Sequence, residues 1–311
     1  MKRLILYAVL FLHVILAKAQ SADTVFVDVD GIKLHTVLCK PGKTNKTPLV
    51  IIIAGSGPTD LNGNQTKLLN NSLLYLSDEL VKNNISTVRF DKRGIAKSAY
   101  AGFDESSLIF EQYANDVVML IDYYKDKGFK DIYLIGHSEG SLVGLIAAKK
   151  RNVSGFVSLC GAGSPIDLVL RKQVKPQLPE PAYEQFGKIL DSLKEGHLVK
   201  SVPPYLYSLF RPSVQPYMIS WMSFDPANLI NTSKMPVLIV QGASDIQIDI
   251  QEAETLYAAN QENKYVTINK MNHVLKTIEG DRNENIASYS NPNLPINAEL
   301  VKTLTEFIFQ N

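Results

Sequence analysis

The segment DIYLIGHSEGSLVGLIAAKK, residues 131–150, joins a strand, a turn and a helix within a short stretch of chain. DIYLIG (131–136) has the apolar character of a buried strand, and SLVGLIAAKK (141–150) has the composition of a helix. Between them, Gly136-His137-Ser138-Glu139-Gly140 fills the pattern G-x-S-x-G completely. A strand followed by this turn and a helix exposes the serine hydroxyl. We therefore predict that Ser138 is a nucleophile rather than part of an ordinary glycine-serine turn.

Strand and helix signals alternate along the rest of the chain. VFVDV (25–29) and KLHTVL (33–38) flank Asp30-Gly31, a strong hairpin turn. Further strands are expected at 48–54, 85–91, 155–161, 237–242 and 265–269, and further helices at 67–83, 110–128, 249–260 and around 301–308. A hairpin followed by such alternation predicts an α/β fold, with a mostly parallel sheet covered by helices on both faces.

A long interruption separates the strands at 155–161 and 237–242. Residues 164–230 hold many prolines, aromatics and helix-like runs, and about 65 residues is small for an independent domain. We interpret them as a helical cap inserted between two parts of the sheet domain, 20–163 and 231–311. Most of its aromatic side chains should form the cap's own core, and some should line an acyl pocket. These aromatics are Tyr183, Phe186, Tyr205, Tyr207, Phe210, Tyr217, Trp221 and Phe224.

The N-terminus has the three regions of a secretory signal peptide. Lys2 and Arg3 precede an apolar run of 14 residues, Leu4 to Ala17, and Ala17-Lys18-Ala19 matches a cleavage site. The apolar run is short for a membrane-spanning helix, which needs about 20 residues. We expect residues 1–19 to be removed and the mature chain to start near Gln20. The expected location is secreted or periplasmic, without a stable membrane anchor.

The overall composition is that of an ordinary globular protein. The 311 residues are 45% hydrophobic and 20% charged, and the net charge of +1 gives no electrostatic reason to expect nucleic acid binding. Cys39 and Cys160 lie in apolar stretches and are expected to be buried thiols. Neither an H-E-x-x-H motif nor a cysteine-histidine cluster occurs, so we expect no metal and no cofactor.

A serine becomes a good nucleophile only when a base removes its proton. Of the five histidines, His273 follows the last predicted strand, in KMNHVLK (270–276), and so belongs at the carboxyl end of the sheet. The others fit this role less well: His13 in the signal peptide, His35 in the hairpin, His137 adjacent to Ser138 in the turn, and His197 in the cap. The sequence therefore favours His273 as the base.

The acid that orients the base should lie between the serine and the histidine in chain order. Five aspartates lie there, and only Asp245, in VLIVQGASD (237–245), directly follows a strand. Asp249 is the rival, but its position suits the first turn of the next helix, where an acidic residue interacts favourably with the helix dipole. We predict Asp245 as the acid.

A second loop contains closely spaced glycines. In PLVIIIAGSGPTD (48–60), a buried strand runs into a loop that holds Gly55 and Gly57. The loop is a poor dinucleotide fingerprint, because Asp60 stands where the third glycine belongs. It is also a poor phosphate loop, because no lysine follows these glycines until Lys67. A remaining role for this loop is to bind the oxyanion of a reacting ester.

From about residue 25 to the C-terminus the chain resembles the α/β-hydrolases, specifically the serine-aminopeptidase-like branch with its esterases and acylglycerol lipases. The resemblance rests on AGSGPTDLNGN (54–64), VRFDKRGIAKS (88–98), GHSEGS (136–141), VLIVQGASDIQI (237–248) and NHVLK (272–276). Two positions depart from the family's pattern. Ala96 stands where a glycine is usual, and Asp249 stands where a proline is common.

The resemblance implies an eight-stranded, mostly parallel sheet and two backbone donors for the oxyanion. One donor is the N–H of Glu139, the residue after the nucleophile. The other lies in the AGSGPTD loop, on Ser56, with Gly57 as the alternative. The side chain of Glu139 could contact either the substrate or an arginine, and the sequence does not distinguish between these two possibilities.

The charged residues at the end of the strand at 85–91 and just after it allow two interpretations. Arg89, Asp91, Lys92 and Arg93 could bind a phosphate or carboxylate, but we favour a polar turn that supports the site from behind, since surface charges are mostly solvated or paired.

The expected function is hydrolysis of small-molecule carboxylic esters with short to medium acyl groups. Two alternatives use the same residues: an acylglycerol lipase, or an aminopeptidase or iminopeptidase. An iminopeptidase would need cap carboxylates, for which Glu180, Glu184, Asp191 and Glu195 are candidates. An alternative of another class is a ligand-binding protein that kept the fold without turnover, because a fold alone does not prove function.

Overall fold

The computed structural model of the protein describes residues 21–311, so the predicted signal peptide lies outside the described residues. The first two strands, β1 (Ser21–Val29) and β2 (Ile32–Lys40), form the expected hairpin. Asp30 and Gly31 have φ values of 51° and 81°. Two consecutive positive φ values are what a type I′ hairpin turn requires.

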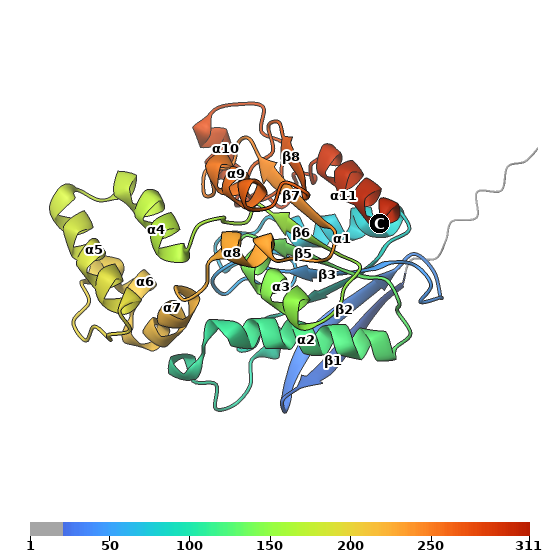
Figure 1. The fold of residues 1–311 in the computed structure, drawn as a ribbon, viewed down its shortest axis with the longest axis horizontal. Coiled ribbons are helices and arrows are strands. Elements are labelled where there is room, and N and C mark those ends of the chain that lie inside the picture. The colour runs from blue at the N-terminus through green and yellow to red at the C-terminus, as the bar shows by residue number, and fades with distance from the viewer. Residues whose placement is uncertain (1–20) are drawn as a thin grey trace, which may run out of the picture.

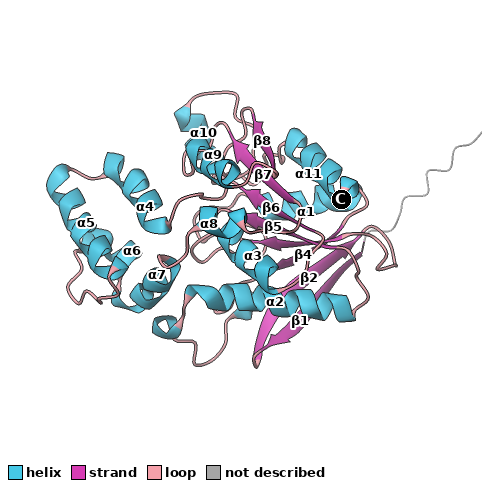
Figure 2. Cartoon of the chain, viewed as in Figure 1, coloured by secondary structure: helices cyan, strands magenta, loops and turns pink. Residues whose placement is uncertain are grey.

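One sheet of eight strands runs through the described part of the chain (Figure 2). The other strands are β3 (Leu49–Ile53), β4 (Ser86–Phe90), β5 (Ile132–His137), β6 (Gly155–Leu159), β7 (Val237–Gly242) and β8 (Lys264–Ile268). Their order is β1-β2-β4-β3-β5-β6-β7-β8. Only the pairings of β2, with β1 and with β4, are antiparallel. The mostly parallel eight-stranded sheet expected from the sequence is therefore confirmed.

Helices cover both faces of the sheet (Figure 1). Along β3, Leu49, Ile51 and Ile53 join one core, and Val50 and Ile52 join the other, as expected where successive side chains point to opposite faces. The first core includes residues of α2 (Phe110–Asp126), α3 (Glu139–Lys150) and α9 (Ile250–Ala259). The second includes residues of α1 (Ser72–Lys82) and α11 (Ala298–Gln310).

Four helices between β6 and β7 form a group beside the sheet domain, on the left of Figure 1. They are α4 (Ile166–Val174), α5 (Glu180–Lys194), α6 (Tyr207–Phe210) and α7 (Gln215–Trp221), and we refer to them as the cap helices. Phe186 and Phe210 are fully buried within this group. The next helix, α8 (Pro226–Asn231), packs against α3 and α9.

Short 3₁₀ helices complete the described elements; they span Ala96–Ser98, Glu105–Ser107, Lys175–Gln177, Pro204–Leu206 and Pro212–Val214. No helix within residues 21–311 is both long and apolar enough to cross a lipid bilayer.

Two local differences separate the fold from the sequence expectation. Helix α1 begins at Ser72 rather than near 67, because the Asn64 side chain accepts hydrogen bonds from the N–H groups of Asn70 and Asn71. Such side-chain bonds compete with helix formation. Helix α10 (Arg282–Ser288) was not expected. It is capped by Asp281, whose carboxylate accepts from the next helical N–H groups, and it has almost no apolar residues to give a periodic signal.

Candidate active site

Ser138 lies at the sharp turn between β5 and α3 in a backbone conformation rare for a residue with a side chain. Its φ is 56° and its ψ is −121°. The neighbouring glycines make room for this turn. A Cβ on Gly136 would lie 2.1 Å from the carbonyl oxygen of Gly140, and one on Gly140 would lie 2.4 Å from that of Ile53. A strained residue held by close-packed neighbours is typical of a functional position.

The glycine loop after β3 packs directly against this turn. A Cβ on Gly55 would lie 3.1 Å from the Cβ of Ser138. Gly57 has a φ of 73°, and the carbonyl oxygen of Ser56 accepts a hydrogen bond from Thr59 Oγ1 at 2.8 Å. Ser56, Gly57, Ser138 and Glu139 all line one cavity. The two segments predicted to supply oxyanion donors are thus adjacent.

His273 and Asp245 are hydrogen-bonded to each other. His273 Nδ1 lies 2.7 Å from Asp245 Oδ2, and both side chains are buried. Asp245 Oδ1 accepts from the N–H groups of Gln247, at 2.8 Å, and Ile248, at 3.0 Å. Burial opposes ionisation, but His273 and these N–H groups hold the pKa of Asp245 below its usual value. An ionised Asp245 accepts a hydrogen bond from Nδ1–H, which keeps the proton on Nδ1 and leaves Nε2 as the basic nitrogen.

The rival acid has a structural role. Asp249 is the N-cap of α9, where its side chain accepts from the N–H of Glu252. A capping aspartate satisfies an otherwise unpaired N–H group at a helix start.

The side chain of His137, next to Ser138, is hydrogen-bonded to the backbone of His273 and helps to hold it in place. Its Nε2 donates to the backbone carbonyl of His273 at 2.8 Å, and the two rings lie 4.8 Å apart. Burial, together with the nearby His273, lowers the pKa of His137 to about 3. His137 therefore stays neutral, with its proton on Nε2.

The remaining histidines of the described chain lie elsewhere. His35 is buried and its Nδ1 lies 2.7 Å from Asp91 Oδ2, whereas the side chain of His197 is 73% exposed.

The charged residues at the end of β4 and just after it are buried rather than solvated, which corrects the surface setting assumed from the sequence. Arg89, Asp91, Lys92 and Arg93 are each at most 6% exposed. Each has a protein partner: Asn62 for Arg89, His35 for Asp91, Glu139 for Lys92 and Asp116 for Arg93. The hypothesis of an open phosphate or carboxylate site at this turn is therefore wrong. The partner of the Glu139 side chain is a lysine, Lys92, and not an arginine.

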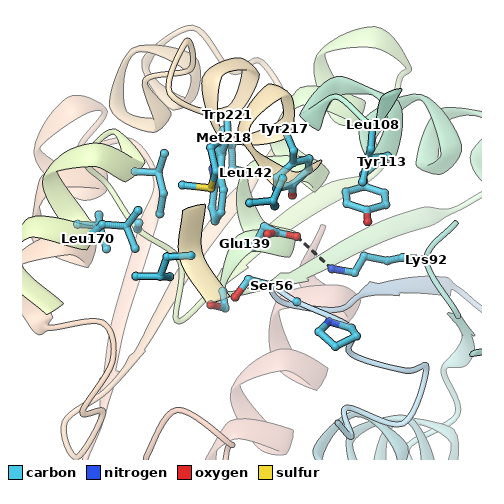
Figure 3. Close-up of a pocket in the computed structure, with 18 of the residues that line it drawn as sticks. Ser56, Lys92, Leu108, Tyr113, Glu139, Leu142, Leu170, Tyr217, Met218 and Trp221 are labelled. Carbon is cyan, nitrogen blue, oxygen red and sulfur yellow. Dashed lines mark hydrogen bonds and ion pairs between the residues drawn. The ribbon is translucent and has the colours of Figure 1, made fainter. Parts of the chain in front are cut away.

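The cavity beside Ser138 has a volume of about 450 Å³ (Figure 3). One part is polar and is lined by Ser56, Lys92, Tyr113, Glu139 and Tyr217. The rest is mainly apolar and lies under the cap helices, with walls that include Leu142, Val169, Leu170, Met218 and Trp221. Of the cap aromatics, Tyr217 and Trp221 line the cavity, whereas Tyr205 and Tyr207 are half exposed and do not.

No carboxylate of the cavity wall is without a cation. Glu139 pairs with Lys92, and Glu105 pairs with Arg211. The four cap carboxylates considered from the sequence are exposed and lie outside the cavity wall; these are Glu180, Glu184, Asp191 and Glu195.

The thiol of Cys160 lies close to Asp245 and His273, a contact that the sequence did not predict. Its sulfur and one ligand atom each of Asp245 and His273 lie within 4.8 Å of one another, and within residues 21–311 no other such trio could hold a metal ion. Burial and the nearby Asp245 raise the pKa of the Cys160 thiol, so it stays protonated. Both Cys160 and Cys39 are buried and free, as expected. The sequence placed Cys160 at the end of a predicted strand, but that this strand lies beside the one before Asp245 is known only from the sheet order.

Solved structures with this architecture define the class of fold. A ferulic acid complex of Est1E from Butyrivibrio proteoclasticus superposes with a TM-score of 0.62 at 19% identity, covering 92% of this chain and 99% of that one. The Pyrococcus furiosus esterase Pf2001 gives 0.60 at 16% identity, covering 94% and 91%. The α/β-hydrolase GrgF from Penicillium sp. sh18 gives 0.61 at 17% identity, covering 94% and 98%. The chain has the α/β-hydrolase fold.

The sequence also matches a family profile. The profile described as serine aminopeptidase, S33, matches residues 71–279, and the chain belongs to this family. Among curated proteins, Esterase EstD of Thermotoga maritima is 24% identical over 248 residues, which cover 77% of this chain. The matched region spans only 57% of the length of that esterase.

Proposed function

We propose that the protein is a serine hydrolase that cleaves carboxylic esters with Ser138, His273 and Asp245. The observation that carries this proposal is the hydrogen-bonded pair of His273 and Asp245, whose histidine backbone is bonded to His137, the residue before the strained Ser138. Serine needs a base, and the base needs an acid that fixes its tautomer; the bonded histidine-aspartate pair supports these roles.

In the proposed reaction, Ser138 Oγ attacks the ester carbonyl carbon while its proton passes to His273 Nε2. Asp245 stabilises the imidazolium that forms. The negative oxygen of the tetrahedral intermediate accepts hydrogen bonds from the N–H of Glu139 and the N–H of Ser56, with Gly57 as the alternative donor. His273 then protonates the leaving alcohol. A water molecule, deprotonated by the same histidine, releases the acid from Ser138.

The cavity supports an uncharged acyl group of short to medium length. Its volume of about 450 Å³ lies in the range of small-molecule sites, about 300–1,000 Å³. The walls under the cap helices are mainly apolar, and the charged side chains in the wall are already paired. Burying a free charge there would be costly.

Two related activities remain alternatives. The family description favours an aminopeptidase, but a carboxylate for a substrate's free amine would have to come from Glu139 or Glu105, which already pair with cations. An acylglycerol lipase would use the same apolar walls, and the dependence of activity on acyl chain length distinguishes it.

The test is hydrolysis of p-nitrophenyl esters with acyl chains of 2 to 16 carbons, together with aminoacyl p-nitroanilides, by the wild type and Ser138→Ala. We expect ester cleavage that is highest for short to medium chains and is lost in the variant. A wild type that cleaves only the anilides would favour the aminopeptidase, and one that favours the longest esters would favour the lipase. A folded wild type that cleaves none of these substrates would favour a ligand-binding protein.

A further inference from the structure

Lys92 connects the ends of three neighbouring strands. It follows β4, and its Nζ lies 2.7 Å from the carbonyl oxygen of Gly55, which follows β3. The same Nζ lies 3.1 Å from Oε1 of Glu139, which follows β5 (Figure 3). The strands β4, β3 and β5 are adjacent in the sheet. One ammonium group therefore touches both segments that carry the proposed oxyanion donors.

The contact with Gly55 acts on the first donor through a shared peptide group. The carbonyl of Gly55 and the N–H of Ser56 belong to one planar amide, and no peptide bond of the described chain is cis. In a trans amide these two groups point in opposite directions, so fixing the carbonyl also fixes the direction of the N–H. A hydrogen bond to the carbonyl also polarises the amide and strengthens its N–H as a donor.

The contact with Glu139 acts on the second donor. Glu139 is the first residue of α3, and its N–H follows the strained Ser138. Its side chain is 2% exposed and turns back to Lys92, which is equally buried. The ion pair therefore holds the residue that presents the N–H and fixes it relative to the Gly55 loop.

The ammonium group has few other contacts. Beyond the two oxygens it lies over the ring of Tyr113, 4.9 Å from the ring centroid. A buried ion pair adds little net stability, because desolvation offsets the attraction of the charges. Stability alone therefore does not account for a lysine at this position.

We infer that Lys92 is a positioning residue that aligns both oxyanion donors, Ser56 N–H and Glu139 N–H. This inference rests on the proposed function. Lys92 takes no part in proton transfer; it acts through the Gly55 peptide and the Glu139 side chain.

The first test compares the steady-state kinetics of the wild type and Lys92→Met on the best p-nitrophenyl ester. Losing a whole oxyanion donor lowers kcat by about 10²–10³-fold. Since Lys92 only aligns the donors, we expect kcat to fall about 10- to 100-fold, with KM changed by less than about threefold. An unchanged kcat in a folded variant would overturn the inference, whereas an inactive wild type would instead overturn the proposed function.

A double variant separates alignment from the cost of an unpaired charge. Lys92→Met leaves the Glu139 carboxylate buried without its cation, which itself can disturb the fold. The double variant Lys92→Met/Glu139→Gln removes that charge but still lacks the Gly55 contact. We expect its kcat to stay at least tenfold below the wild type. Recovery to near wild-type kcat would show that Gly55 needs no partner and would overturn the inference.

A neighbouring ion pair provides a matched control. Arg93 and Asp116 are also buried and paired, with Nε–Oδ2 at 2.8 Å, and no hydrogen bond or ion pair of the described residues joins either of them to the Gly55 loop or Glu139. The variant Arg93→Met/Asp116→Asn should keep kcat within about threefold of the wild type. An equal loss of kcat in this control would mean that any buried ion pair near the site has the same effect.

A spectroscopic measurement reports on the oxyanion donors directly. A carbamoyl-enzyme formed with a ¹³C-labelled aryl carbamate carries its carbonyl on Ser138. Weaker hydrogen bonding to that carbonyl raises its infrared stretching frequency. We expect a higher frequency in Lys92→Met than in the wild type and the Arg93→Met/Asp116→Asn control. An identical frequency in all three proteins would contradict alignment by Lys92.

Discussion

Asp245 is the residue whose proposed role can be tested with the smallest change in shape. Asparagine at this position would keep the volume but would lose the carboxylate that accepts from His273 Nδ1, 2.7 Å away. The imidazole would then favour the wrong tautomer. We expect Asp245→Asn to lower kcat for esters on the order of 10⁴-fold, measured against the wild type at pH 7–8. Asp249→Asn serves as the control and should retain activity, since Asp249 caps α9.

His137 makes stability depend on pH. Its pKa is lowered to about 3 in the folded protein, from an ordinary value of 6.5. As the pH falls below 6.5, the unfolded chain therefore binds this proton first, and the stability contributed by the neutral ring is progressively lost. We expect His137→Gln to reduce the slope of unfolding free energy against pH by up to about 1.4 kcal/mol per pH unit between pH 6 and 4. Urea unfolding at several pH values measures this slope, and equal slopes would contradict the expectation.

The three proposed catalytic residues were chosen because they come soon after strands. Ser138 directly follows β5, Asp245 comes soon after β7 and His273 soon after β8, and parallel strands bring their carboxyl ends to one edge. Lys92 and Cys160 follow strands too, but their partners depend on which strands are neighbours. That order is a property of the folded sheet, and so the contacts of Lys92 and Cys160 could not be predicted.

Among the elements, the turn from β5 to α3 depends most strongly on close packing. A Cβ on Gly140 would lie 2.4 Å from the carbonyl oxygen of Ile53, a backbone atom that cannot move aside cheaply. We expect Gly140→Ala to lower the free energy of unfolding by about 1–3 kcal/mol or more, measured by urea unfolding. Gly42→Ala is the control, because no atom lies within 4 Å of its added Cβ. A similar loss in both variants would contradict a specific packing requirement at the turn.

Helix α4 of the cap should set the acyl length. Leu170 lies in the cavity wall and is 8% exposed, whereas Leu168 on the same helix is 47% exposed and lies outside the wall. Leu170→Trp should shorten the preferred acyl chain and lower kcat/KM for the longest good substrate about tenfold or more, since a blocked apolar pocket loses a few kcal/mol of binding. Leu168→Trp should keep the wild-type profile. A profile unchanged in Leu170→Trp would place the acyl group elsewhere.

Helices and strands with a regular apolar pattern were predicted well, whereas the mainly polar helix α10 was not. The apolar periodicity of α2 and the alternating core contacts of the strands come from local sequence. Helix α10 lacks such a pattern and is held by polar contacts: Asn285 reaches the carbonyl of Ser244 and accepts from Asn272. Those partners come from distant parts of the chain.

At the scale of the whole molecule, the sequence predicted the architecture because several motifs agree with one another. The hairpin at Asp30-Gly31, the alternation that follows and the order of the motifs all fit one sheet topology. The residues of the cavity wall were harder to predict. Many of them come from the cap helices, which lie outside the sheet, so the order of the strands does not indicate where these residues lie. Tyr217 and Trp221 line the cavity, whereas Tyr205 and Tyr207 do not, although all four looked alike in the sequence.

The most direct test for an activated nucleophile at Ser138 is labelling of the purified protein with a fluorophosphonate probe, followed by peptide mass spectrometry. Such a probe reacts with a serine only when a nearby base activates it. We predict one labelled residue, Ser138, no labelling of Ser138→Ala, and much slower labelling of His273→Ala. A folded wild type that is not labelled, or a label on another serine, would contradict an activated nucleophile at Ser138.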